Sequence, residues 1–103
     1  MANQATSSRN PNVIDTFGAD VIIGGTSGVR QIVSSIVLEG ATAGDTATFI
    51  DGSGNEVLRL STTANNGSIV WSPAVPFSFS NGLTFDDSAS SLASNDFVFV
   101  YLA

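Results

Sequence analysis

The hydrophobic run near the C-terminus constrains the fold of this chain more than any other feature. Residues 97–102 read Phe-Val-Phe-Val-Tyr-Leu, so a strand formed here is apolar on both faces. Such a strand cannot belong to a sheet that has one face in water. It must therefore lie at the centre of a sandwich, or another subunit must cover its outer face.

Turn signals divide the remaining residues into short segments. Clusters of Gly, Ser, Asn and Asp recur at a spacing of roughly eight to twelve residues and separate apolar, often β-branched runs. Residues 29–39 also fit a helical stripe, but nearly all their apolar positions are β-branched and two serines lie in the middle, which favours a strand. We predict an all-β chain of about seven strands, folded as an antiparallel β-sandwich that is jelly-roll-like or Greek-key.

Two hairpins are expected within this sandwich. With residues 51–56 as the first loop, one apolar and one mainly polar face result. That register pairs Ile50 with Val57, Phe49 with Leu58 and Ala47 with Leu60. A three-residue turn at 80–82, with Gly82 in the left-handed conformation, predicts the second hairpin. It sets Phe79 opposite Leu83 and Phe77 opposite Phe85.

The N-terminal residues differ in composition from the rest of the chain. Residues 1–18 are mostly polar and show neither the helical nor the strand period, so we expect an extended arm followed by a β-sandwich domain over residues 19–103. The arm is either a frayed terminus or a segment that docks onto a neighbouring protein. Its spaced apolar residues favour docking: Val13, Ile14 and Phe17.

The composition excludes most catalytic chemistry. The chain has no Lys, His or Cys, so nucleophilic triads and their Ser-Lys or Cys variants are impossible. Two-carboxylate mechanisms remain formally open through Asp86 with Asp87, Asp96, or Asp51 with Glu56. Adjacent Asp86 and Asp87 in a strand would point to opposite faces, however, and polar surface loops are the simpler explanation for these acids. We therefore expect a protein that is not an enzyme and has no cofactor.

Charge and hydropathy restrict the partners. Three Arg stand against nine acidic residues, for a net charge of −6, which disfavours nucleic acids and anionic membranes. The first ten residues lack the apolar core of a signal peptide and no run approaches a membrane span. We expect a soluble protein that is made and kept in the producing cell or released by its lysis.

Three other features have both a binding and a structural interpretation. The oxygen-rich loop 51–56 weakly resembles a calcium loop, but a hairpin needs the same residue types. Trp71 and the phenylalanines form either a sugar-binding platform or part of the core. Arg30 and Arg59 either mark a subunit contact or lie in solvent. With the arm residues, the interface candidates are Val13, Ile14, Phe17, Arg30, Arg59, Phe97, Phe99 and Tyr101.

The order of segments from residue 41 to residue 102 suggests a family. A strand leads into Asp51-Gly52, and a strand beginning at Gly67-Ser68 follows. A Pro-x-x-Pro segment (Pro73 to Pro76), the turn Phe79-Ser80-Asn81-Gly82-Leu83 and the aromatic last strand complete the order. In this succession the chain resembles small structural proteins of tailed bacteriophages. The resemblance covers about three fifths of the chain and consists of turn and strand residues, without a catalytic signature.

The resemblance implies a component of the virion. The expected function is that of a capsid decoration (cement) protein, a homotrimer on the capsid exterior that clamps neighbouring major capsid subunits and is made in the host cytoplasm. An alternative is a β-module of the neck, tail or fibre with a receptor- or glycan-binding role. A plain β-domain of the host cell is a third interpretation. Trimerisation without glycan binding would favour the decoration protein, and affinity for sugar would favour the receptor- or glycan-binding module. A lone monomer would favour the plain β-domain of the host cell.

Overall fold

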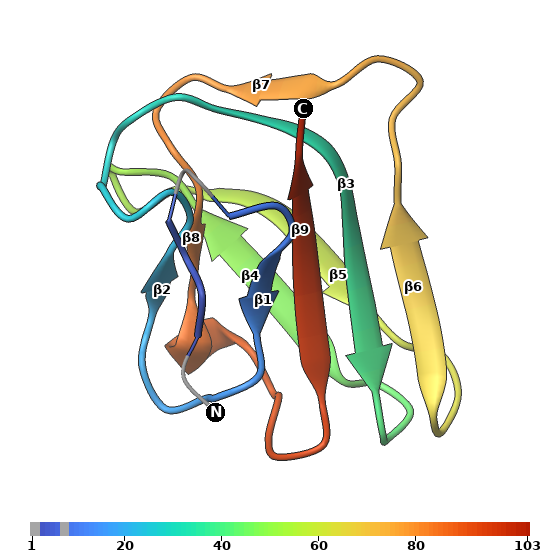
Figure 1. The fold of residues 1–103 in the computed structure, drawn as a ribbon. Coiled ribbons are helices and arrows are strands. Elements are labelled where there is room, and N and C mark those ends of the chain that lie inside the picture. Colours follow the sequence, from blue (N-terminus) through green and yellow to red (C-terminus); the bar gives the residue numbers. More distant parts are fainter. Residues whose placement is uncertain (1–2, 7–8) are drawn as a thin grey trace.

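The computed structural model describes residues 3–6 and 9–103, and it confirms the predicted antiparallel β-sandwich (Figure 1). One layer, here called the β9 sheet, contains β1 (Asn12–Ile14), β9 (Phe97–Leu102), β3 (Gln31–Gly40) and β6 (Gly67–Trp71), with β7 (Phe77–Phe79) paired to the start of β3. The other layer, the β4 sheet, contains β2 (Val21–Ile22), β8 (Thr84–Phe85), β4 (Thr46–Ile50) and β5 (Glu56–Ser61). One short turn of 3₁₀ helix, η1 (Asp87–Ala89), follows β8.

The strand pairings are nested, as in a jelly roll. β1 pairs with β9, β2 with β8, β3 with β6 and β4 with β5, so the first four strands meet later strands in reverse order. β7 is additional to this scheme. The described part of the chain has nine strands instead of the expected seven, in part because β1 forms inside the segment expected to be an arm.

The core lies between the two sheets and consists of the inward-facing positions of both. Alternation along β9 buries Val98 and Val100, and alternation along β4 buries Ala47 and Phe49. The ring of Phe85 lies edge-on to Phe49, with ring centres 5.9 Å apart. The buried hydrophobic residues are Ile14, Val21, Ile23, Val33, Ile36, Leu38, Ala47, Phe49, Leu60, Phe79, Leu83, Phe85, Val98 and Val100.

Residues 29–39 form most of strand β3, as predicted, and a β-bulge explains their helix-like spacing. The pairing with β9 shifts register between Val33 and Ser35, and Ser34 donates a hydrogen bond to the carbonyl oxygen of Tyr101 at 3.1 Å. The bulge places two residues between the buried side chains of Val33 and Ile36. Val33 and Ile36 are therefore three positions apart on the buried face, a spacing that is usual in a helix, although both residues belong to a strand.

The β4–β5 hairpin confirms most of its predicted register. Phe49 lies opposite Leu58 and Ala47 opposite Leu60, with the polar residues on the other face. The expected pair of Ile50 and Val57 is wrong, because a bulge after Phe49 sets Ile50 opposite Glu56.

The second predicted hairpin is wrong, although its turn is correct. Gly82 has φ +83° and its N–H bonds to the carbonyl oxygen of Phe79 at 3.2 Å. The two flanking strands, however, belong to different layers: β7 pairs with β3, and β8 pairs with β2 and β4. The turn thus carries the chain from one sheet to the other, and Phe77 and Phe79 do not pair with Phe85 and Leu83.

The N-terminal segment is integrated into the sandwich. Residues 12–14 pair with β9 as an edge strand, and Ile14 is fully buried in the core. Phe17 packs edge-on against Phe85, with ring centres 5.7 Å apart. The structure therefore differs from the expected arm over residues 1–18, because the apolar residues of this segment find their partners within the same chain. Four residues of the expected arm lie outside the described part of the chain: Met1, Ala2, Ser7 and Ser8.

The loop contacts yield a prediction for two glycines with nearly the same backbone conformation. Gly82 (φ +83°) has room for no side chain, since a Cβ there would lie 3.0 Å from the backbone nitrogen of Gly28, whereas a Cβ at Gly54 (φ +85°) meets nothing within 4 Å. Both Gly→Ala changes carry the left-handed strain of about 1–2 kcal/mol. Only Gly82→Ala adds a cost of overpacking, which is expected to lower its free energy of unfolding by about 1–3 kcal/mol more than that of Gly54→Ala. Unfolding in urea measures the difference. An equal loss of unfolding free energy in the two variants would show that the backbone around Gly28 shifts to accommodate the added methyl group.

Candidate functional site

The outer face of β9 is the strongest candidate for a functional surface. Val98 and Val100 point into the core, so Phe97, Phe99 and Tyr101 point outward. Phe97 and Tyr101 remain 36% and 37% exposed, and the rings of Phe97 and Phe99 stack with their centres 6.1 Å apart. The described residues thus leave this side of the last strand open to solvent.

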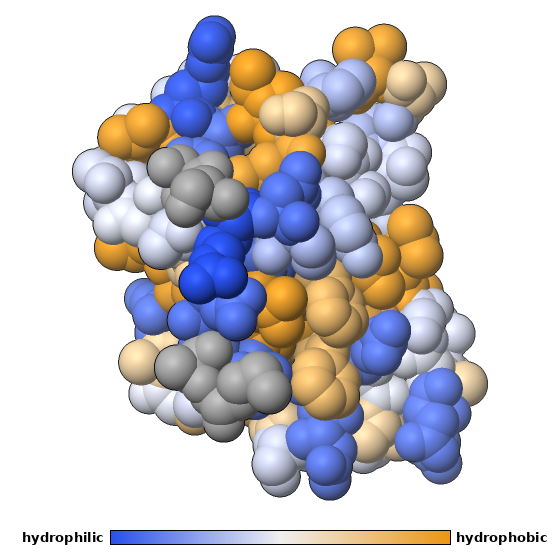
Figure 2. All heavy atoms as spheres, viewed as in Figure 1, coloured by the Kyte–Doolittle hydropathy of each residue, from blue (hydrophilic) through white to orange (hydrophobic). Residues whose placement is uncertain are grey.

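Neighbouring strands continue the apolar surface on both sides of β9. Phe99 lies between Val13 on β1 and Val37 on β3, and Val37 lies next to Val70 on β6. Val70 is 62% exposed. Figure 2 shows hydrophobic colours over β9 and its neighbours on this face. We call this surface the apolar band; it consists of Val13, Val37, Val70, Phe97, Phe99 and Tyr101.

The apolar band is nearly free of charge. Glu39, opposite Phe97 at one end of β3, is the one charged residue in the four strands β1, β9, β3 and β6. A sheet with one face in water normally carries polar side chains on that face. Depletion of charged residues around aromatic side chains is instead typical of the centre of a protein–protein interface.

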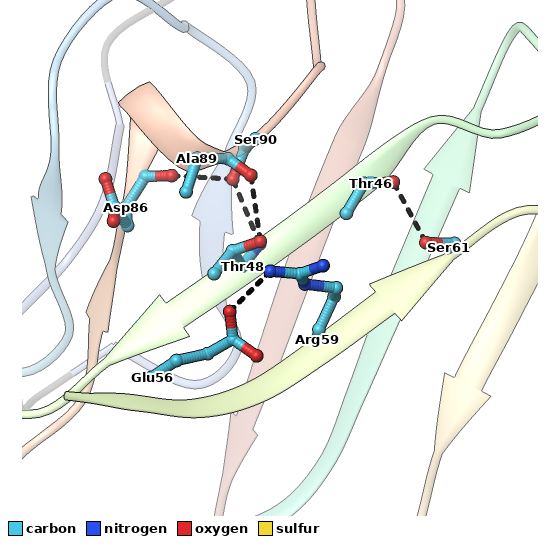
Figure 3. A network of polar contacts seen from close by, with 8 residues as sticks. All are labelled: Thr46, Thr48, Glu56, Arg59, Ser61, Asp86, Ala89 and Ser90. Carbon is cyan, nitrogen blue, oxygen red and sulfur yellow. Dashed lines mark hydrogen bonds and ion pairs between the residues drawn. The ribbon is translucent and has the colours of Figure 1, made fainter.

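The outer face of the β4 sheet is different, because its polar groups bind one another (Figure 3). Thr46 and Ser61 share a hydrogen bond of 2.9 Å between their hydroxyl groups, and Arg59 forms an ion pair with Glu56 at 2.6 Å. The hydroxyl of Thr48 donates to the carbonyl oxygen of Ala89 at 2.9 Å. The two faces of the sandwich thus differ in chemistry: one is polar and internally bonded, the other apolar.

The interface candidates from the sequence separate into three groups. Val13, Phe97, Phe99 and Tyr101 lie together on the apolar band. Ile14 lies in the core and Phe17 packs against it. Contrary to the expectation, these two side chains therefore pack within the chain and not against a partner. Arg30 is exposed in the loop before β3, and Arg59 is engaged by Glu56 of its own strand.

Two residues of the apolar band were not among the candidates. Strand alternation around Ile69 and Trp71 already indicates that Val70 points outward, so a signal for it existed. Val37 had no such signal, because the bulge in β3 changes which residues face the core.

A cleft of about 280 Å³ opens at another part of the molecule, lined in part by β5, β7 and the two loops beside them. Its lining includes Val57, Phe77 and Phe79 as well as Asp51 and Asn81. Phe79 and Trp71 pack with the core, which supports the core interpretation for these two aromatic residues. Phe77, by contrast, is 49% exposed.

Asp51 is held in a defined position at the rim of this cleft. Its Oδ1 accepts hydrogen bonds from the backbone N–H groups of Ser53 and Asn55, at 2.9 and 3.0 Å. The N–H of Asn55 is the main cause of a lowered pKa for the Asp51 carboxyl. The carboxylate is therefore ionised at neutral pH. Its contribution to stability is present above the unfolded-state pKa and is lost as the pH falls through the folded-state pKa.

Two other acidic residues, Asp96 and Asp87, bind backbone N–H groups of the loops. Asp96 is 3% exposed, and its two carboxylate oxygens accept from the N–H groups of Ala41 and Ala93 at 2.8 and 2.9 Å. Asp87 accepts from the N–H of Gly18 at 2.9 Å. Among residues 3–6 and 9–103, no group of three or more acidic side chains is placed to hold a metal ion. These contacts support a structural role for the acids.

Two further findings concern the whole chain. In its described part, no helix has the length and hydrophobicity needed to cross a membrane. Comparison with known proteins found no family model, no curated protein and no solved structure that matches the chain.

Proposed function

We propose that this protein is a non-enzymatic structural component of a tailed-bacteriophage virion, a capsid decoration protein that clamps neighbouring major capsid subunits. The observation that supports the proposal is the apolar band on the outer face of the β9 sheet. Phe97, Phe99 and Tyr101 expose aromatic surface there, and Glu39 is the one charged residue within strands β1, β9, β3 and β6. An exposed apolar patch on a sheet face is typical of a site that another protein covers.

The energetics of such a contact suit a role in assembly. Burial of apolar surface contributes about 25 cal/mol per Å², and a standard interface buries about 800 Å² on each partner. The apolar band has six residues, against roughly 20–30 on each side of a standard interface, so one contact through the band alone is modest. Copies arranged around a symmetry axis of the capsid, as a homotrimer, add several such contacts and hold neighbouring subunits together by multivalency.

The strand order and the low charge of the chain agree with this role. The jelly roll presents the outer face of the five-stranded β9 sheet to a partner. The polar residues of the chain are mainly Ser, Thr and Asn, and a surface with few charges suits a protein that works inside a larger assembly. The resemblance of residues 41–102 to phage structural proteins supplies the specific setting.

The decisive experiment locates the protein in purified particles. Tailed particles from the lysed producing culture are analysed by mass spectrometry and labelled with antibodies against the chain for electron microscopy. The proposal expects the protein in many copies on the capsid exterior. Its absence from the particles, or its confinement to the tail tip, would refute the decoration role.

Substitution of the apolar band gives a second, quantitative prediction. Val70→Ser and Phe99→Ser are expected to weaken binding of the purified protein to stripped capsids by tenfold or more, since central apolar side chains dominate interface energies at about 1–2 kcal/mol or more each. Val75→Ser is the matched control, because Val75 is a similarly exposed valine (75%, against 62% for Val70) outside the strands. Equal binding by all three variants contradicts a role for the band.

A further inference from the structure

The cleft near β7 has an aromatic wall that is fixed in place. The ring of Phe77 packs edge-on against Phe79 and against Trp71, with ring centres 4.8 and 6.1 Å apart. Phe79 is almost fully buried, yet Phe77 keeps 49% of its surface exposed. Phe77 therefore offers an aromatic surface at the cleft without the entropy cost of ordering a free side chain on binding.

The cleft lining also includes polar groups, which hydrogen bonds between two loops hold in place. The N–H of Gly52 donates to the carbonyl oxygen of Asn81 at 2.8 Å, and the side-chain amide of Asn81 donates to the hydroxyl of Ser53 at 3.0 Å. A Cβ on Gly52 would lie 2.8 Å from the Cα of Gly28, so the loops touch at their backbones. The carboxylate of Asp51 and the amide of Asn81 are thereby held side by side at the cleft.

This arrangement restricts the ligand by its hydrogen-bonding chemistry. An ionised carboxylate only accepts hydrogen bonds, whereas an amide both donates and accepts. A pair of neighbouring hydroxyl groups satisfies both, since each hydroxyl donates and accepts. The aromatic wall in addition requires an apolar C–H surface, and the negative charge of Asp51 repels acidic ligands. The volume of about 280 Å³ lies at the lower end for small-molecule sites, which limits the contact to a small ring.

We infer that the cleft binds a neutral saccharide, with one sugar ring against Phe77 and two adjacent hydroxyl groups on Asp51 and Asn81. The site does not involve the apolar band. Sugar binding by itself favours the receptor- or glycan-binding alternative, so the location of the protein in purified particles tests the decoration role separately. The cleft gives the molecule a carbohydrate-binding site in addition to its assembly surface.

The test is a titration of the full-length protein, followed by amide chemical shifts in two-dimensional NMR. The probes are glucose, galactose, mannose, N-acetylglucosamine and their disaccharides, with N-acetylneuraminic acid as the acidic counterpart. At least one neutral sugar is expected to shift amides of residues 51–57 and 77–82 at millimolar concentration, and the acidic sugar to leave them unchanged. No shift with any neutral sugar at tens of millimolar overturns the inference, as do shifts confined to other segments.

Two variants examine the two sides of the cleft. Phe77→Leu keeps an apolar side chain but removes the ring, and Asp51→Asn removes the charged acceptor; each is expected to weaken sugar binding roughly tenfold. Val70→Ser, which alters the apolar band only, is the control and is expected to bind as the unmodified protein does. Thermal unfolding of each variant verifies that it is folded. Unchanged affinity in both folded cleft variants also overturns the inference.

Discussion

A chain lacking residues 1–18 is expected to lose its cooperative folded state. Truncation removes β1, which pairs with β9 from Asn12 to Ile14, and it removes the aromatic contact between Phe17 and Phe85. The loss of a buried side chain such as Ile14 alone costs about 2–5 kcal/mol, and domains of this size are stable by about 5–15 kcal/mol. Circular dichroism and urea unfolding of the truncated chain measure the effect.

Two neighbouring residues provide a single-site version of this experiment. Ile14 is fully buried, whereas Val13 lies next to it on the outer face of the same strand. Ile14→Ala is expected to lower the free energy of unfolding by about 2–5 kcal/mol, and Val13→Ala by less than about 1 kcal/mol. If the truncated chain unfolds as cooperatively as the full chain and the two alanine variants are equally stable, the segment is a detachable arm after all.

Phe85→Ala is expected to be the most damaging single substitution in the core. The ring of Phe85 is fully buried and contacts Phe49 and Phe17, so it joins β8 to β4 and to the N-terminal segment. Removal of a buried Phe side chain costs about 3–5 kcal/mol. In a domain of this size each kcal/mol lowers Tm by roughly 4–8 °C, so the fall in a calorimetric scan is large.

Phe97→Ala serves as the control for this substitution. Phe97 is also a strand phenylalanine, but it lies 36% exposed on the apolar band. The isolated chain is expected to tolerate its loss far better than that of Phe85, because part of the ring surface is never removed from water on folding. A similar fall in Tm for both variants would mean that the outer face of the β9 sheet is buried in the protein as it exists in solution.

Local pattern was sufficient for the elements whose partners are close in sequence. The β4–β5 hairpin follows from alternation and from the turn residues of its loop, and the structure confirms the pairs Phe49 with Leu58 and Ala47 with Leu60. The two-sided hydrophobicity of residues 97–102 left two alternatives, a strand at the centre of the sandwich or an outer face covered by another subunit. In the structure β9 lies between β1 and β3 in its sheet, and its outer aromatic side chains Phe97 and Tyr101 are partly exposed. Three of the four apolar-band residues named from the sequence lie on this strand: Phe97, Phe99 and Tyr101.

Features that depend on partners far along the chain could not be predicted in this way. The pattern around residues 77–85 fits a hairpin, but β7 pairs with β3 in one sheet while β8 pairs with β2 and β4 in the other. A one-residue bulge in β3 decides that Val37 faces outward beside Phe99. A single shift in register reverses the face of every later side chain, and alternation alone does not reveal it.

The sequence by itself thus determined the class of the fold, most of the register of the β4–β5 hairpin and the hydrophobic character of the last strand. It did so because these depend on the residue types within one segment. Only the tertiary structure decided that residues 12–14 complete the β9 sheet and that Val13, Val37 and Val70 extend the surface of β9 into a band. The physical reason is that the pairing of strands depends on how residues distant in sequence are buried together. The residues of one segment do not contain that information.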